Sequence, residues 1–285
     1  MKKGLKILGL ILGIFILISP FLLIQFGKNA LNDNGVPLIP ELSPANTKQR
    51  IMAFFPHPDD EVTVSGTLID LKRKGHEVFL VTLTKGEAGS SPENYPPDKL
   101  KEIRTQEMKN SAQILEVDSL FLLDYEDGGL SLLGQDSLEA LTLSWIKDLN
   151  PDIILSYDSK VGLYGHEDHR LTGLAVENVF LSHIGDPGFS PKALYQVTLS
   201  NKQIKLALEL SEGFRNNYPK EKDSGLPKPD FAVNIQPYFD TKLEVMKAHH
   251  SQRHVLSDLM PWHDQIPVWI YSRIFDREYY HEVKK

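Results

Sequence analysis

The stretch IMAFFPHPDDE, residues 51–61, joins an apolar run to a polar turn. The five apolar residues 51–55 predict a buried β-strand. Prolines on both sides of His57 prevent simple continuation of that strand and hold the histidine and the acids after it in a rigid turn. A turn of this kind lies where open α/β sheets bind their ligands, although acids at such a place can also merely cap a following helix.

Strand and helix patterns alternate along the chain after this turn. Strand patterns are found at residues 78–84, 120–123, 153–157, 193–199 and 231–235, and helical patterns at 63–74, 100–115, 138–149, 168–181, 204–210 and 238–250. This alternation predicts an α/β fold with a mostly parallel, Rossmann-like, doubly wound sheet that has helices on both faces. We expect one domain over residues 49–285.

The composition excludes several classes of protein and site. The chain has 285 residues, of which 41% are hydrophobic and 24% charged, and this is typical of a globular protein. It contains no cysteine, which excludes disulfides, thiolate zinc sites, iron–sulfur clusters and a thiol nucleophile. The formal net charge of -7 provides no general attraction to phosphate backbones, so nucleic acid is not an expected partner.

The amino terminus predicts a membrane segment. Residues 7–24 form an uncharged apolar run, preceded by three lysines, that is long enough to cross a bilayer as a helix. We predict a membrane anchor over residues 1–26, with a cleavable signal segment as the alternative. The positive-inside rule then places the body outside the cytoplasm, or secretes it if the segment is cleaved. Residues 27–48, rich in Asn, Pro and Gly, predict a linker.

A second polar cluster follows the fourth predicted strand. The sequence YGHEDH, residues 164–169, leads into a predicted helix on which His166 and His169 are spaced to share one face. Because both loops follow strands, they reach the same edge of the sheet. One imidazole from this cluster, added to His57 and Asp60, makes a set of two histidines and one carboxylate, the ligand count of a catalytic zinc site. The same set also binds Fe(II), so the ligand types leave the metal open.

These motifs resemble a known family, the PIG-L/LmbE-like zinc N-deacetylases, whose members carry a His-Pro-Asp-Asp-Glu turn and a later His-x-Asp-His. Three further motifs look like those of this family: TLTKGEAG at residues 82–89, Arg104 with Glu107, and HHSQ at 249–252. All of them occur in the family's order and together span residues 51 to 252.

The resemblance implies a role for each residue of the two main motifs. His57, Asp60 and His169 would bind the metal, which would be Zn²⁺, with Fe²⁺ or another divalent ion as the alternative. Asp59 would be the general base, and His166 would be the general acid or the partner of the oxyanion.

The remaining motif residues would orient the site or touch the substrate. By the resemblance, Asp168 would hold the imidazole of the general acid, and Tyr164 matches a position where some members place a mobile tyrosine over the site. The substrate contacts would come from Arg104, Glu87 and His249.

The function implied by the resemblance is that of a zinc-dependent N-deacetylase. It would remove the acetyl group from an N-acetylglucosamine-containing sugar or glycoconjugate, and the predicted anchor would add the membrane as a second partner. Amide hydrolysis needs an activated water, a polarised carbonyl and a proton for the leaving amine, which these residue types supply. Two alternatives stay open: a metal hydrolase of the same fold with another amide or acyl substrate, and a noncatalytic glycan-binding module.

Overall fold

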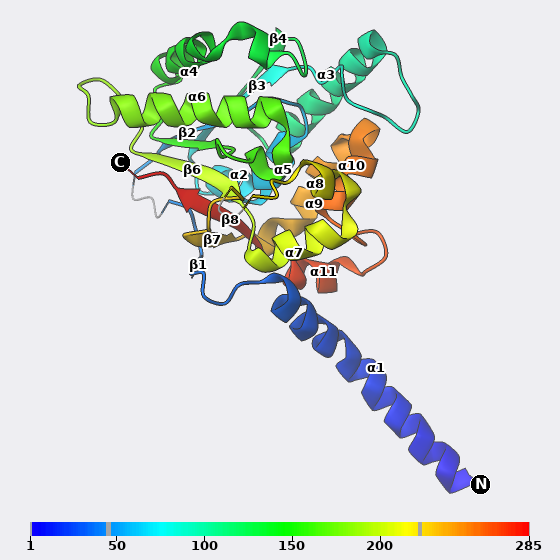
Figure 1. Cartoon of the computed structure of the whole chain (residues 1–285). Coiled ribbons are helices and arrows are strands. Elements are labelled where there is room, and N and C mark those ends of the chain that lie inside the picture. The colour runs from blue at the N-terminus through cyan, green and yellow to red at the C-terminus, as the bar shows by residue number, and fades with distance from the viewer. Residues whose placement is uncertain (1, 44–46, 222–223, 285) are drawn as a thin grey trace.

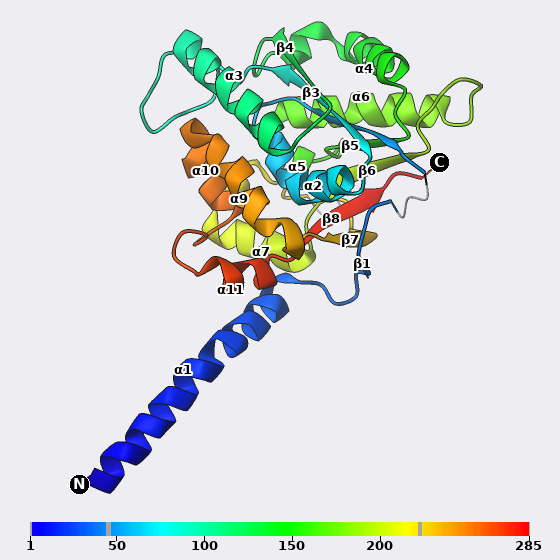
Figure 2. The ribbon, with the colours of Figure 1, turned by 180° about the vertical axis from the view of Figure 1, so that it is seen from behind.

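The computed structural model describes residues 2–43, 47–221 and 224–284, with side chains from residue 17 on. In this part of the chain an eight-stranded sheet forms the centre, and helices cover both of its faces (Figures 1 and 2). The strands are β1 (Leu38–Ile39), β2 (Arg50–Phe55), β3 (Glu77–Thr84), β4 (Ser119–Tyr125), β5 (Ile153–Ser156), β6 (Ala193–Thr198), β7 (Phe231–Asn234) and β8 (Arg277–Glu282).

The helices differ widely in length. The α-helices are α1 (Lys2–Leu31), α2 (Ser65–Arg73), α3 (Pro97–Ile114), α4 (Gln135–Leu149), α5 (Gly162–Gly165), α6 (Glu167–His183), α7 (Asn201–Leu210), α8 (Glu212–Asn217), α9 (Phe239–Ala248), α10 (Arg253–Leu259) and α11 (Val268–Ile274). Four short 3₁₀ helices are η1 (Asp60–Val64), η2 (Leu130–Leu133), η3 (Gln236–Tyr238) and η4 (His250–Gln252).

The sheet has the order β1-β7-β8-β6-β5-β2-β3-β4. The five strands from β6 to β4 are parallel, as predicted, and their order reverses between β2 and β5. Strand β8 is antiparallel to both β6 and β7, so the sheet is mixed at this end. The predicted linker at residues 27–48 contributes β1, which pairs in parallel with β7.

The central strand β2 is buried on both faces, which explains its unbroken apolar run. Ile51 and Phe55 belong to the core on the face that α2 and α9 cover, whereas Met52 and Phe54 belong to the core under α4 and α6. The predicted single α/β domain with a mostly parallel sheet is therefore confirmed, and the end of β2 is fixed in the interior of the molecule.

The prediction for the amino terminus is wrong. Among the described residues, no helix is long and apolar enough to cross a bilayer. Helix α1 projects from the body (Figure 1), but its last turns carry Gln25 and Lys28, and Lys28 pairs with Asp276 at 2.8 Å. Leu31 is buried against α11. This end of the helix therefore docks on the body, and the predicted transmembrane helix and the location outside the cytoplasm are not supported.

Helix α6 lies directly against the backbone of the loop that follows β5. A Cβ atom added to Gly173 would lie 2.6 Å from the carbonyl oxygen of Asp158 and 2.7 Å from that of Tyr157. Only a glycine permits this approach, because the atoms in the way are backbone atoms, which cannot turn aside.

We expect Gly173→Ala to lower the free energy of unfolding by roughly 1–3 kcal/mol, since helix and loop must separate to make room for the methyl group. Gly213→Ala in α8 is the matched control, because the nearest atom to its added Cβ is 3.8 Å away. Urea unfolding of both variants measures the difference. Equal stability of the two would contradict the close packing of α6.

Candidate metal centre and active site

Two loops meet at the point where the strand order reverses. One follows β2 and contains His57, Asp59 and Asp60, and the other follows β5 and leads into α6. The side chain of Asp158 shapes the second loop by accepting hydrogen bonds from three backbone N–H groups. Ligands bind at such a reversal point in open α/β sheets because the loops there diverge and leave a crevice.

The three predicted metal ligands converge on one point. Nδ1 of His57 lies 3.0 Å from Nε2 of His169 and 3.6 Å from Oδ2 of Asp60, and Nε2 of His169 lies 3.2 Å from Oδ1 of Asp60. In a tetrahedral site with bonds of about 2.0–2.1 Å, two ligand atoms are about 3.3 Å apart. The two histidines, each measured to a different oxygen of Asp60, are therefore close to the separations that a small tetrahedral cation would require.

His57 and His169 each make a polar contact through the ring nitrogen that faces away from the other histidine, and these contacts orient the two rings. Nδ1 of His169 donates to the carbonyl oxygen of Gly162 at 3.0 Å, so Nε2 is the nitrogen with a free lone pair. Nε2 of His57 faces oxygens of Asp127 at 3.0 Å and of Asp168 at 3.2 Å, which leaves Nδ1 free. Two lone pairs facing each other in a buried site fit a bound cation between them.

The charges around His57 favour a cation as well. Burial lowers the pKa of His57, but the carboxylates of Asp127, Asp168 and Asp60 have the larger, opposite effect and raise the pKa to about 10. Burial raises the pKa of Asp60, but His169 and His57 lower it more, to about 2, so that this carboxylate is ionised. A site with this much negative charge has a strong preference for an added positive charge.

Asp59 lies beside this point in a different backbone conformation. Its φ angle of 90° is left-handed, and its Oδ2 lies 3.2 Å from the guanidinium of Arg104. Burial raises the pKa of Asp59 to about 6, against the opposing charge of Arg104. The side chain lines the cavity and makes no capping bond to η1.

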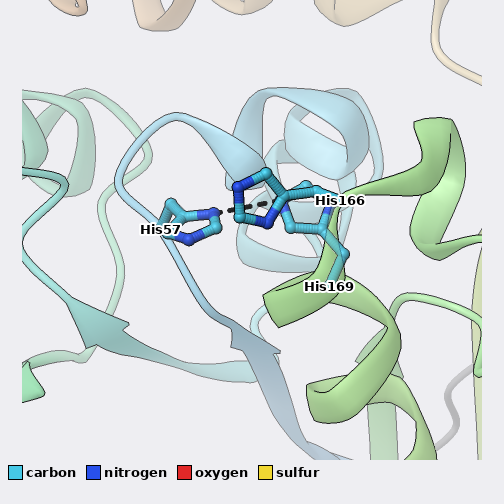
Figure 3. Close-up of side chains that lie close together, drawn as sticks. All are labelled: His57, His166 and His169. Atoms are coloured by element: carbon cyan, nitrogen blue, oxygen red, sulfur yellow. Dashed lines mark hydrogen bonds between the residues drawn. The ribbon is translucent and has the colours of Figure 1, made fainter. Parts of the chain in front are cut away.

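The imidazole of His166 is neutral and faces the same cavity. The residue caps the amino end of α6, where its Nδ1 accepts a hydrogen bond from the N–H of Asp168 at 3.2 Å. Burial, together with His57 and His169, lowers the pKa of His166 to about 4. Figure 3 shows the three imidazoles gathered between the β2 loop and the start of α6. Their nitrogen atoms are close enough together to hold a metal ion, and so are the ligand atoms of His57, Asp127 and Asp168.

The cavity at this site has a volume of about 520 Å³ and two different ends. The polar end contains His57, Asp59, Asp60, Asp127 and His166, together with Tyr164, whose ring lies 4.9 Å from that of His169. The far wall is built by α7, α8 and α10. Its apolar residues are Leu206, Leu210, Phe214, Val255 and Leu259, and its polar residues are Gln203, Asn217, His254 and Asp258.

Comparisons with known proteins identify the family to which the chain belongs. The family model described as "PIG-L: GlcNAc-PI de-N-acetylase" matches residues 52–180. The diacetylchitobiose deacetylase of Thermococcus kodakarensis is 30% identical over 211 residues, which cover 73% of this chain and 72% of that protein. The chain belongs to the PIG-L family. The prediction of an N-deacetylase is thereby confirmed, against that of a noncatalytic module.

Two further relatives support the same assignment. The 1D-myo-inositol 2-acetamido-2-deoxy-alpha-D-glucopyranoside deacetylase of a Mycobacterium species is 27% identical, over 79% of this chain and 80% of that protein. The solved structure of N,N'-diacetylchitobiose deacetylase from Pyrococcus horikoshii superposes with a TM-score of 0.61 at 22% identity, over 85% of this chain and 86% of that one. This last likeness shows that the two share a fold.

Three predicted residues of this PIG-L deacetylase lie elsewhere than the sequence suggested. The carboxylate of Asp168 does not hold His166 but faces His57 and accepts from the N–H of Gly128. Glu87 is outside the cavity lining and accepts from the N–H of Asp127. His249 is fully buried and bonded to Glu61, so that a substrate cannot reach it.

The guanidinium of Arg104 does line the cavity, but most of its bonds are to the protein itself. Its NH1 group donates to the carbonyl oxygen of Gly86 at 2.9 Å, and its NH2 group donates to that of Pro58 at 2.5 Å. In this structure Arg104 therefore braces the turn that carries Asp59.

Asp127 is a site residue that the sequence analysis missed. It follows β4, so it reaches the same edge of the sheet as the two motif loops, and it is buried with its Oδ1 on His57 and its Oδ2 on the N–H of Ala88. The signal was present in the sequence as an acid followed by two glycines directly after a strand.

Asp127→Asn tests the part that this carboxylate plays in metal binding. Because the carboxylate polarises and orients the His57 ring, we expect metal affinity to fall by about 10- to 100-fold. Asp124→Asn, a change of the same kind at an exposed residue of β4, is the control and leaves affinity unchanged. Competition with a chelator measures both constants, and equal affinities would contradict the role of Asp127.

Proposed function

We propose that the protein removes the acetyl group from an N-acetylglucosamine-containing substrate, with Zn²⁺ bound by His57, Asp60 and His169. The short distances among these three side chains carry the proposal, because two histidines and one carboxylate are the protein ligands that a catalytic zinc ion would need, and His57 and Asp60 line the cavity. The names of the Thermococcus and Mycobacterium relatives support the substrate, since both are named as deacetylases of acetylated amino sugars. A zinc ion at this position activates water and polarises an amide carbonyl.

Asp59 is the proton acceptor in this proposal. Its carboxylate lines the cavity, and its pKa of about 6 lets it hold a proton for part of the cycle near neutral pH. It takes a proton from the attacking water as the carbon–oxygen bond forms. It then passes this proton to the amide nitrogen as the carbon–nitrogen bond breaks, which yields acetate and the free amine.

His166 and Tyr164 act as hydrogen-bond donors. Because Nδ1 of the neutral His166 ring accepts from the backbone, the ring proton lies on Nε2, which is free to donate to the developing oxyanion. This favours the role of oxyanion partner over that of general acid. Burial raises the pKa of Tyr164, so that its hydroxyl keeps its proton and can donate as well.

The apolar side chains of the far wall favour a second candidate, which is a substrate that carries an apolar group in addition to the acetamide. Five aliphatic or aromatic side chains line this wall, and a bare monosaccharide offers them nothing to bury. In this candidate the chemistry at the polar end is the same, and the bond broken is an amide of a different or larger molecule.

Asp59→Asn tests the proposed chemistry. Loss of the proton acceptor lowers kcat for acetate release by about 100- to 10,000-fold, while the metal content stays at the level of the parent protein. Asp186→Asn, at an exposed residue after α6, is the control and retains kcat. Acetate is measured by an enzyme-coupled assay and metal by mass spectrometry. Full activity of Asp59→Asn would eliminate this residue as the base.

A panel of acetylated substrates separates the two candidates. We expect acetate release from N-acetylglucosamine, its methyl and octyl glycosides, and diacetylchitobiose. If the apolar wall contributes, kcat/KM is highest for the octyl glycoside, and Leu210→Asp removes that preference without changing kcat/KM for the methyl glycoside. Release from none of the four, by protein with one metal ion per chain, would refute the sugar substrate.

A further inference from the structure

The backbone of Asp59 is in a conformation that an aspartate seldom adopts. Its φ and ψ angles are 90° and -18°, in the left-handed region that favours glycine. A residue stays in such a conformation only when its surroundings hold it there. The side chain of Asp59 contributes no cap to η1 that would explain it. The surroundings must therefore supply the force that keeps this turn in place.

Two side chains hold the turn from opposite sides. The N–H of Asp59 donates to Oε2 of Glu61 at 3.0 Å. On the other side, Arg104 donates to the carbonyl oxygen of Pro58 and lies 3.2 Å from the Asp59 carboxylate. Arg104 touches the side chain that would do chemistry, whereas Glu61 touches only the backbone.

Glu61 is fixed by partners from two distant parts of the chain. It is 1% exposed, and its Oε1 accepts from the hydroxyl of Ser111 in α3 and from Nε2 of His249, each at 2.5 Å. His249 is itself 0% exposed and lies at the junction of α9 and η4. A buried carboxylate that accepts from a charged donor and from a hydroxyl is held in one position. Because the N–H of Asp59 donates to the same carboxylate, the backbone of Asp59 is held in place as well.

We propose that Glu61 and His249 are positioning residues that hold the backbone of Asp59 and so keep its carboxylate where the reaction needs it. The proposal rests on the proposed role of Asp59 as proton acceptor. It gives His249 a part in the reaction even though no substrate can reach its side chain. Glu61 and His249 act through the Asp59 amide and are not themselves catalytic residues.

A second buried glutamate, Glu107, already attaches η4 to α3, so Glu61 and His249 are not needed for that attachment. Glu107 of α3 accepts from both the N–H and the hydroxyl of Ser251, at 2.7 and 2.6 Å. This pair joins α3 directly to η4, which Glu61 connects through its separate bonds to Ser111 and His249, and Glu107 has no hydrogen bond to Asp59. Unlike Glu107, Glu61 also accepts a hydrogen bond from the N–H of Asp59.

The pair Glu107 and Ser251 also provides a matched control. Glu61→Gln and Glu107→Gln make the same chemical change at buried glutamates that link the same segments. We expect Glu61→Gln to lower kcat by about 10- to 100-fold with KM and metal content unchanged, because the carboxylate of Asp59 is displaced from its place. Glu107→Gln, measured on the folded fraction, keeps the kcat of the parent protein.

A second readout does not depend on activity. In protein labelled with ¹⁵N-aspartate, the amide proton of Asp59 resonates far downfield because it donates to a carboxylate. We expect an upfield shift in Glu61→Gln and in the double variant Glu61→Gln/His249→Gln, which removes both charges and leaves neither buried alone. Glu107→Gln leaves the resonance in place. An unmoved resonance in Glu61→Gln would overturn the proposal.

A double-mutant cycle separates positioning from general damage. If Glu61 acts through Asp59, then Glu61→Gln has no further effect on the residual kcat of Asp59→Asn. Additive losses would overturn the proposal. If Glu61→Gln does not fold, Ser111→Ala removes one bond to Glu61 and keeps the ion pair. A smaller fall in kcat with a smaller upfield shift then supports the proposal, and no change in either overturns it.

Failure of the proposed function is distinguishable from failure of this inference. If the parent protein releases acetate from no substrate in the panel, the proposed function fails. The Asp59 amide resonance still reports in that case whether Glu61 and His249 hold the turn.

Discussion

Parallel pairing of β2 with β5 is the constraint on which the site depends. Ile51, Met52 and Ala53 pair with residues 153–155, so the two strands end side by side although about a hundred residues separate them in the chain. The loops after these strands then open in the same direction and bring His57 within 3.0 Å of His169. No local sequence preference could do this, because the two histidines belong to different strand–helix units.

The charge around His57 determines what these loops can hold. Three carboxylates surround one imidazole in a region from which water is largely excluded, and such an arrangement is costly without a compensating cation. The outer carboxylates, Asp127 and Asp168, are fixed by backbone N–H groups of the β3 and β4 loops. The centre is therefore built from the ends of four strands, β2, β3, β4 and β5, and the residues that β3 and β4 supply are not among the predicted metal ligands.

The sequence was sufficient for the parallel half of the sheet and for the main motifs, because both have strong local signals. The run 51–55 is apolar without interruption, and His57 is fixed between two prolines. Strand β8 has no such signal, since its sequence REYYHE begins and ends with charged residues, and it is held by pairing with β6 and β7 on both sides. The apolar run at the amino terminus had a strong signal but led to a wrong prediction, because hydropathy does not reveal where a helix docks.

Motif position also does not reveal the direction of a side chain. Glu87 and His249 were expected at the substrate because their motifs reach the correct edge of the sheet, yet both side chains turn toward the protein and brace other loops. The segment 249–252 therefore has a different role from the substrate contact that the sequence analysis expected. Gln252 of this segment lines the cavity, but His249 does not: it bonds to Glu61, which accepts from the N–H of Asp59, the one residue of the β2 turn with a left-handed backbone. A family motif can thus belong to an active site without facing it, when the strain of a catalytic turn must be balanced from behind.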